Sequence, residues 1–239
     1  MSERFPFAVP DFDRGQRKGV PEVILANRKT VEQTLAIVQA FLARTGRAIL
    51  SRVGPELETR LHTDFAEQAA CEWLSTCRAA VLRRPDFTLA LTGGRVGVLT
   101  AGTSDVAVAE EAALLCREMG CTVHTAYDVG VAGLHRLFGP LHEMLETSRV
   151  DALIVAAGMD GALPSVVAGL VDVPVVGLPV SVGYGVGGEG LAALYSMLQT
   201  CAPGLSVVNI DNGIGAGAVA GLIANRVAAA RRAALSQGG

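Results

Sequence analysis

Residues 152–179 read ALIVAAGMDGALPSVVAGLVDVPVVGLP, and this stretch decides the fold class. It begins with a continuous apolar run, Ala152–Ala157, which is followed by the loop Gly158–Gly161. A helix candidate, Leu163–Leu170, leads to a second apolar run, Val173–Leu178. Short runs that are apolar throughout, instead of at alternate residues, are typical of strands covered on both faces of a sheet. The stretch therefore predicts two parallel strands joined by a helix.

The same alternation of strand and helix continues on either side of this stretch. We expect strands at Val96–Ala101, Thr122–Tyr127, Ala152–Ala157, Val173–Leu178 and Ser206–Ile210. We expect helices at Val106–Met119, Gly133–Ser148, Leu163–Leu170, Leu191–Thr200 and Ala216–Ala234. This order predicts an α/β domain over residues 93–239, built as a doubly wound parallel sheet with helices on both faces.

Residues 1–92 differ from this domain, because they are richer in charged residues and alternate less regularly. Thr30 stands three residues before Gln33, which is the spacing of a capping box, and it begins a helix that Gly46 ends. We expect a short strand at Ala48–Val53 and another helix at Glu67–Leu82. The N-terminal region is therefore predicted to be a smaller α+β unit.

The composition of the chain narrows the classes of function. Of its 239 residues, 50% are hydrophobic and 18% are charged, and the formal net charge is −3. A weakly acidic chain without a long Lys/Arg run is not expected to bind nucleic acid. The start of the chain lacks the apolar run of a signal peptide, and Asp and Pro residues interrupt the apolar stretch 152–182, so no membrane span is expected. Five Cys without a C-x-x-C pair, and four His without a zinc-binding spacing, predict a cytoplasmic protein with reduced thiols.

Loops at the carboxyl ends of the expected strands carry the candidate binding residues. In a doubly wound sheet these ends share one edge, where ligands bind. Glycines there allow sharp turns and let backbone amides approach an anion at a helix N-terminus, which suits a phosphorylated nucleotide. The candidate substrate-binding residues are Gly102, Thr103, Ser104, Asp105, Asp128, Gly158, Met159, Ser181, Gly183, Tyr184, Gly185, Asn209, Asp211 and Asn212. Tight turns would also explain the glycines, and the 103–105 segment would also serve as a helix cap.

Two further residues are candidates for catalysis. Asp160 follows a strand between two glycines and has no neighbouring Lys or Arg, so it would serve either as a general base or as the cap of the next helix. Cys201 lies at the end of a helix candidate, just before the last expected strand. It would serve either as a nucleophile or as an inert cysteine.

The C-terminal domain resembles the aminoimidazole ribonucleotide carboxylases of purine biosynthesis. The shared motifs are Gly102-Thr-Ser-Asp105, Ala157-Gly-Met-Asp-Gly-Ala-Leu-Pro164 and Pro174-Val-Val-Gly-Leu-Pro179. The resemblance implies a three-layer, flavodoxin-like fold. The chain differs from those enzymes at Tyr127–Arg136, which replaces their active-site Ser-Ala-His-Arg stretch, and in its N-terminal extension.

A resemblance to the LarB family covers nearly the whole chain. It rests on Arg17-x-Gly-x-Pro-Glu-Val-Ile24 with Lys29-Thr30, on the Gly102–Asp105 loop, on Gly158–Gly169 and on the run from Cys201 to Gly217. This family makes the organic precursor of the nickel pincer nucleotide cofactor of lactate racemase. The resemblance implies that the protein uses carbon dioxide to carboxylate C5 of the pyridinium ring of nicotinic acid adenine dinucleotide. It also implies hydrolysis of the phosphoanhydride by water, which gives pyridinium-3,5-biscarboxylic acid mononucleotide and AMP.

The same resemblance implies roles for individual residues. Addition of the Cys201 thiolate to ring C4 would dearomatise the ring and make C5 nucleophilic toward carbon dioxide. Asp160, where the family more often has Glu, would then take the C5 proton. The phosphates would lie on the loops Gly102–Asp105 and Gly183–Gly190. No tightly bound cofactor is implied, and a Mg²⁺ ion bridging the phosphates would suit the hydrolysis.

Two other functions stay open on the sequence alone. The fold would also suit a carboxyaminoimidazole ribonucleotide mutase of purine biosynthesis, or a nucleotide-binding protein without catalytic activity. The related purine enzymes form octamers, and the C-terminal helices carry many Val, Ala and Leu residues. We therefore expect a homo-oligomer, with an octamer as the candidate assembly.

Overall fold

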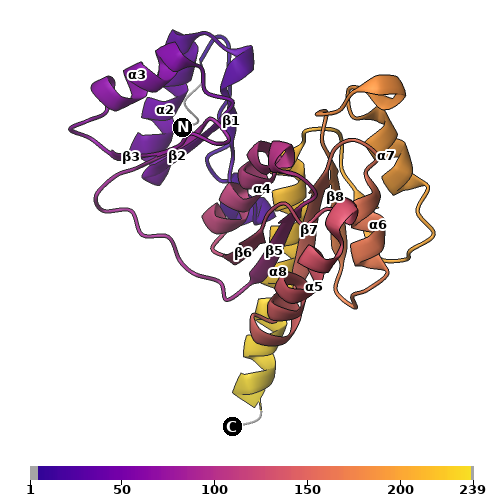
Figure 1. Ribbon diagram of the computed structural model, residues 1–239. Coiled ribbons are helices and arrows are strands. Elements are labelled where there is room, and N and C mark those ends of the chain that lie inside the picture. Colours follow the sequence, from indigo (N-terminus) through magenta and orange to yellow (C-terminus); the bar gives the residue numbers. More distant parts are fainter. Residues whose placement is uncertain (1–4, 238–239) are drawn as a thin grey trace. The chain divides into compact units, whose positions relative to one another are not determined.

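The computed structural model, which describes residues 5–237, divides into an N-terminal unit, Met1–Leu89, and a C-terminal unit, Ala90–Gly239 (Figure 1). The sequence predicts a boundary between residues 92 and 93. Each unit has its own sheet and its own hydrophobic core.

The sheet of the C-terminal unit consists of five strands with the order β6-β5-β7-β8-β9, and all neighbours are parallel. The strands are β5 (Arg95–Thr100), β6 (Thr122–Ala126), β7 (Ala152–Ala157), β8 (Val175–Pro179) and β9 (Leu205–Val207). In chain order this is the 2-1-3-4-5 arrangement of flavodoxin-like sheets. The predicted α/β fold class is therefore confirmed.

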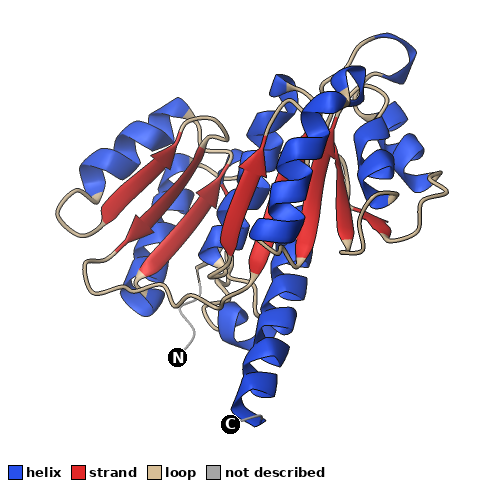
Figure 2. Ribbon diagram, turned by 60° about the horizontal axis from the view of Figure 1, so that its bottom comes forward, coloured by secondary structure: helices blue, strands red, loops and turns tan. Residues whose placement is uncertain are grey.

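Helices cover both faces of this sheet, which gives three layers (Figure 2). The α-helices are α4 (Val106–Glu118), α5 (His135–His142), α6 (Ala162–Ala168), α7 (Leu191–Leu198) and α8 (Gly213–Gln237). Alternate residues of β7 separate the two cores: Ile154 packs with α4 and α8, whereas Leu153 and Val155 pack with α5, α6 and α7. Because both faces are covered, all of β7 is buried, as its apolar sequence predicts.

Shorter turns of helix join these elements. The 3₁₀ segments are η2 (Thr103–Asp105), η3 (Val131–Gly133) and η5 (Gly185–Gly187), and a π-helical segment, η4 (Glu143–Thr147), continues α5. The predicted helix Gly133–Ser148 thus begins at the last residue of η3 and contains α5 and η4 in succession. The other predicted strands and helices of this unit are present with ends shifted by a few residues, as is usual where helices fray and strands taper.

Helix α8 packs closely on α4 because glycines leave no side chain between them. A Cβ atom at Gly217 would lie 2.6 Å from the carbonyl oxygen of Ala112. Among the described residues, α8 is also the one helix that is long and apolar enough to cross a membrane. Its alanines 216, 220 and 224 are fully buried in the core, and Arg231 pairs with the buried Asp151 at 2.7 Å. One face of α8 therefore packs in the core of the C-terminal unit.

The N-terminal unit contains a four-stranded mixed sheet with the order β1-β2-β4-β3 (Figure 1). Its strands are β1 (Ile24–Leu25), β2 (Arg47–Ser51), β3 (Ala70–Leu74) and β4 (Ala79–Arg83). Its helices are α1 (Arg14–Lys18), the 3₁₀ segment η1 (Ala26–Arg28), α2 (Val31–Thr45) and α3 (Pro55–Asp64). The capping box at Thr30 and the left-handed end at Gly46 are both present, so the sequence predicts α2 correctly.

The predicted helix Glu67–Leu82 is wrong, because these residues form the antiparallel hairpin of β3 and β4. Ser75–Arg78 make the turn, and Arg78 has a φ of 50°, which does not occur inside an α-helix. The four residues of Ala79–Leu82 are all fully buried, because β4 is a central strand with neighbours on both sides. Such a buried apolar run cannot be told from a helix by periodicity alone. Helix α3 and strand β1 are not predicted from the sequence.

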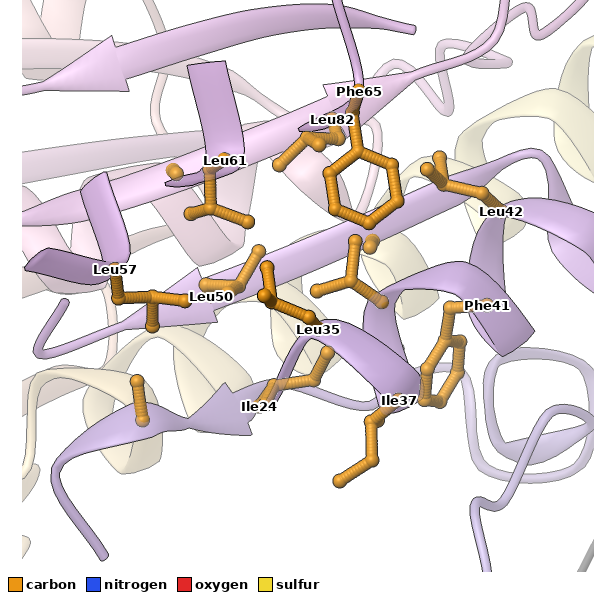
Figure 3. Close-up of a cluster of buried hydrophobic side chains, with 14 of the residues drawn as sticks. Ile24, Leu35, Ile37, Phe41, Leu42, Leu50, Leu57, Leu61, Phe65 and Leu82 are labelled. Carbon is orange, nitrogen blue, oxygen red and sulfur yellow. The ribbon is translucent and has the colours of Figure 1, made fainter. Parts of the chain in front are cut away.

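The core of the N-terminal unit lies between its sheet and helices α2 and α3. Figure 3 shows Leu35, Leu57 and Leu61 of the helices gathered around Leu50 and Leu82 of the strands, and all five are buried. This single cluster covers one face of the sheet. The unit therefore has a hydrophobic core that belongs to it alone.

Replacement of Leu50 by Ala is expected to destabilise this unit. Leu50 is fully buried, so the change removes apolar contacts and leaves a cavity, which costs about 2–5 kcal/mol of the free energy of unfolding. Leu25 on the neighbouring strand β1 is 40% exposed and provides the matched control. Urea denaturation of both variants measures the difference, and equal midpoints for Leu50→Ala and Leu25→Ala would contradict this packing.

Candidate functional site

A cavity of about 450 Å³ opens at the carboxyl edge of the C-terminal sheet. Loops that follow four strands line it, at 101–105 after β5, 128–136 after β6, 158–160 after β7 and 182–184 after β8. The order of the strands reverses between β5 and β7, so the cavity lies at the topological switch point. Doubly wound sheets bind their ligands at this place.

Asp105 connects two of these loops from below the surface. It is 3% exposed, and its Oδ2 accepts a hydrogen bond from the Gly102 amide at 2.8 Å, while its Oδ1 accepts one from the Gly158 amide at 3.0 Å. Burial raises the pKa of this carboxyl, against the effect of the two amides. A Cβ atom at Gly158 would lie 2.2 Å from the Val182 carbonyl oxygen, so only glycine lets the β7 and β8 loops meet here. Asp105 therefore holds the floor of the cavity in place.

Arg136 is a cavity residue that is not among the site residues predicted from the sequence. Its Nη1 donates to Asp128 Oδ2 at 2.6 Å, and its Nε donates to the Gly133 carbonyl at 3.4 Å. Among the described residues it is the one Lys, Arg or His that lines the cavity. The signal that was available is its position in the loop after β6, eight residues beyond Asp128. The pair presents a guanidinium group that is already oriented at the rim.

Asp160 lies on the cavity wall and is exposed. Its Oδ1 accepts a hydrogen bond from the Ala162 amide, the first of α6, at 3.3 Å, whereas the N-cap position of this helix is Gly161. The preceding residue, Met159, has a φ of 48°, a left-handed conformation that non-glycine residues seldom adopt. Asp128 shares this feature with a φ of 57°. Strained backbone of this kind is often found where a loop must present a side chain to a ligand.

The structure brings together a large part of the predicted substrate-binding set. The residues that line the cavity are Gly102, Ser104, Asp105, Asp128, Gly158, Met159, Gly183 and Tyr184. Those that do not line it are Thr103, Ser181, Gly185, Asn209, Asp211 and Asn212. Asp211 instead accepts a hydrogen bond from the Ser181 amide at 2.8 Å, and Asn212 accepts one from the Gly215 amide at 2.8 Å in the first turn of α8. These two side chains therefore order the loop around β9.

Of the five cysteines, Cys201 is the exposed one. Burial raises the pKa of Cys121 to about 11 and raises that of Cys116 still further, and it also raises the pKa of Cys71. Buried thiols with raised pKa values form thiolates poorly. Cys201 is thus the cysteine that solvent and ligands reach most freely.

Cys201 and Asp160 lie at opposite edges of the same sheet. Cys201 is between α7 and the amino end of β9, where the Gly204 carbonyl accepts from the Val175 amide at the start of β8. Asp160 follows the carboxyl end of β7. Because these strands are parallel and a five-residue strand spans about 16 Å, the thiol cannot reach a ligand beside Asp160 in the same chain. The sequence-based pairing of these two residues is therefore not made within one chain.

A larger hollow of about 710 Å³ lies at the amino edge, beside the Asp151–Arg231 ion pair. It is lined by η4, by the segments that precede β7 and β8, and by Arg231 of α8, and it receives none of the candidate residues. The smaller cavity at the carboxyl edge is therefore the candidate site. Within residues 5–237, no group of three or more His, Cys, Asp or Glu side chains could hold a metal ion.

Comparison with known proteins gives the family. The family model described as AIR carboxylase matches residues 95–238, which is more than half of the chain. The chain belongs to the AIR carboxylase family. A second model, described as the LarB/PurE-like N-terminal domain, matches residues 2–84, so the chain has the two-domain organisation expected from the resemblance to LarB. That resemblance is confirmed.

Individual relatives agree with this assignment. An uncharacterized protein of Methanocaldococcus jannaschii is 40% identical over 216 residues, which is 90% of this chain and 82% of the relative. The N5-carboxyaminoimidazole ribonucleotide mutase of the same organism is 35% identical over 48% of this chain and 69% of its own length. The mutase of Thermotoga maritima is 30% identical over 54% of this chain and 74% of its own length.

Proposed function

We propose that this LarB-type protein carboxylates C5 of the pyridinium ring of nicotinic acid adenine dinucleotide and hydrolyses the phosphoanhydride, giving pyridinium-3,5-biscarboxylic acid mononucleotide and AMP. The observation that carries the proposal is the position of Asp160, an exposed carboxylate on the wall of the cavity. The cavity has three carboxylates and one guanidinium group, a balance that favours a cationic ring. The cavity lies in the region that matches the AIR carboxylase family model, and the same chain has a LarB-type N-terminal domain.

The carboxylation needs a nucleophile, because a pyridinium ring is too electron-poor to attack carbon dioxide. The thiolate of Cys201 forms a bond to C4, and the electron pair of the ring then makes C5 nucleophilic. C5 attacks carbon dioxide and gains the new carboxylate. Asp160 removes the proton from C5, the C4–S bond breaks, and the electron pair of the C5–H bond restores the aromatic ring while the thiolate leaves. The proton on Asp160 is released to solvent, so the thiolate and the carboxylate are both regenerated.

This mechanism requires two copies of the chain at each site, because Cys201 and Asp160 lie at opposite edges of the sheet. A surface suited to such contact leads to the thiol. Leu191, Tyr195 and Leu198 share one side of α7 and are 47%, 62% and 60% exposed, and Cys201 follows three residues later. An exposed apolar stripe of this kind is typical of a protein–protein interface. We therefore propose a homo-oligomer in which the thiol of one copy enters the cavity of another, as an octamer would allow.

The remaining groups bind and position the dinucleotide. The amides of the Gly102 and Gly183 loops lie at the edge where helices begin, and they suit the two phosphates. The guanidinium group of Arg136, which Asp128 holds in place, suits the carboxylate on C3 of the ring. The hydrolysis follows carboxylation and uses water.

The second candidate function is that of two of these relatives, the N5-carboxyaminoimidazole ribonucleotide mutases of Methanocaldococcus jannaschii and Thermotoga maritima. It is favoured by the match over the C-terminal unit. Two observations favour the first function instead. The β6 loop presents Asp128 and Arg136 where the purine enzymes have Ser-Ala-His-Arg, and the chain has a LarB-type N-terminal domain.

Product analysis by mass spectrometry tests the proposal. We expect wild-type protein with nicotinic acid adenine dinucleotide and bicarbonate to form AMP and the biscarboxylated mononucleotide in equal amounts. Asp160→Asn removes the base and is expected to lower the rate about 100-fold or more, whereas the exposed Asp172→Asn control is expected to retain it. A parallel assay would supply N5-carboxyaminoimidazole ribonucleotide. Its conversion, without any reaction of the dinucleotide, would support the second function. Tight binding of the dinucleotide without any product would show a protein without catalytic activity.

A further inference from the structure

The N-terminal unit has a cavity of its own, about 320 Å³ in volume, which no part of the proposed reaction uses. Three cationic side chains line it: Lys29 before α2, Arg52 after β2 and Arg78 in the β3–β4 turn. Glu56 in the first turn of α3 is the one carboxylate among the lining residues. Residues that are far apart in the sequence thus bring an excess of positive charge to one hollow.

The backbone around this cavity holds the cations in defined places. The Arg78 Nε donates to the Val53 carbonyl at 3.0 Å, and the Val53 amide donates back to the Arg78 carbonyl at 2.8 Å. The Lys29 Nζ donates to the Leu25 carbonyl at 3.1 Å. Arg52 and Arg78 both have left-handed backbones, with φ values of 58° and 50°. Two arginines are therefore held at the same cavity in a conformation that costs about 1 kcal/mol or more each.

Helix α3 begins at the same hollow. Gly54 and Pro55 line it, and the N-cap residue Gly54 has no side chain that could cap the first turn. In contrast, the capping box of Thr30 and Gln33 occupies first-turn donors of α2. The N-terminus of a ten-residue helix carries partial positive charge. The cationic side chains and this helix end therefore both attract an anion.

We propose that this cavity is a second binding site, and that it takes the phosphate group of a phosphorylated ribose compound such as a nucleoside monophosphate. Arginine and lysine side chains beside a helix N-terminus are groups that bind a phosphate monoester. Glu56 and Asn27 at the wall suit the hydroxyl groups of a sugar, because a carboxylate and an amide accept hydrogen bonds from them. The volume suits a small ligand. The inference does not rest on the proposed reaction.

Calorimetric titration of the full chain tests this site, with AMP, ribose 5-phosphate, adenosine and inorganic phosphate as probes. We expect AMP and ribose 5-phosphate to bind, adenosine to fail, and inorganic phosphate to bind more weakly. Arg52→Gln and Lys29→Gln are each expected to weaken ribose 5-phosphate binding tenfold or more. Arg60→Gln is the matched control, because Arg60 is a cation of the same unit that pairs with Asp64 at 2.7 Å outside the cavity.

Unchanged ribose 5-phosphate affinity in Arg52→Gln and Lys29→Gln would overturn the proposal, and so would adenosine binding as tightly as AMP. Inorganic phosphate that binds as tightly as ribose 5-phosphate would overturn the assignment of a sugar phosphate. An equal loss of ribose 5-phosphate affinity in Arg60→Gln would also overturn the proposal, because the change in net charge alone would then explain the weaker binding of all three variants. Asp160 and Cys201 belong to the other unit, so carboxylase turnover measured separately shows which of the two proposals has failed.

Discussion

Mixing two inactive variants, Cys201→Ala and Asp160→Asn, is expected to restore carboxylation. Each variant alone lacks one reacting group, so each should be at least about 100-fold slower than the wild type. The two groups lie at opposite edges of one sheet, and the proposed site therefore combines Cys201 of one copy with Asp160 of another. In a randomly mixed oligomer, about a quarter of the sites would have both groups intact. Recovery to about that fraction of wild-type turnover is the predicted result.

The design of this experiment requires oligomers that contain both variants. Co-expression with two different affinity tags and sequential purification would isolate them, and turnover would be followed as AMP release. Cys77→Ala is the matched control, since this half-buried thiol belongs to the N-terminal unit and should not affect turnover. If mixed oligomers stay as inactive as each variant, the two residues do not act together across copies. Full activity of Cys201→Ala alone would show that the reaction does not use the Cys201 thiolate.

Asp105→Asn is expected to abolish most activity without removing any group that reacts. Both oxygens of Asp105 accept backbone amides, from Gly102 and Gly158. An asparagine has one oxygen, and its NH₂ group would face an amide donor, so one loop loses its anchor. A buried donor left without a partner costs about 1–3 kcal/mol of the free energy of unfolding. Because the two loops carry the phosphate-binding amides and Asp160, we expect turnover to fall about 100-fold.

Two measurements separate this positioning role from simple unfolding. Thermal denaturation should show a folded Asp105→Asn protein with a lowered midpoint, and the substrate titration should show a raised KM together with the lowered kcat. Asp172→Asn is the matched control, because Asp172 is an exposed aspartate of the same unit that does not line the cavity. Asp105→Asn turnover equal to that of Asp172→Asn would show that the loops keep their places without the Asp105 carboxylate.

The sequence predicts the C-terminal sheet well because its strands are short, apolar and separated by glycine-containing loops. Ala152–Ala157 is found as β7 with the predicted bounds. The N-terminal unit is harder, because its hairpin has no recognised turn motif and the buried run Ala79–Leu82 looks alike in a strand and a helix. Local sequence patterns carry no information on the strands that pair with β4. Pairing with β2 and β3 in the folded chain makes this run a strand and not a helix.

Site residues that directly follow a strand could be predicted from the sequence. Distances between residues on different loops could not, because the folded chain determines them. Asp105 and Asp160 were found from their position after β5 and β7, and both line the cavity. Cys201 was correctly placed just before the last parallel strand, which puts it at the other edge, but the family resemblance assigned it and Asp160 to one reaction without regard to their separation in a single chain. Arg136 was missed because its role comes from the ion pair with Asp128 across the turn of η3.

The most direct test of the proposed carboxylation is the fate of labelled carbon dioxide. The wild-type protein would be incubated with nicotinic acid adenine dinucleotide and ¹³C-bicarbonate, and the mononucleotide product would be analysed by mass spectrometry and NMR. The predicted result is a mononucleotide that carries ¹³C in a new carboxylate and has lost its proton at ring C5. A mononucleotide that contains no ¹³C and keeps the C5 proton would contradict the proposal, since the protein would then only hydrolyse the dinucleotide.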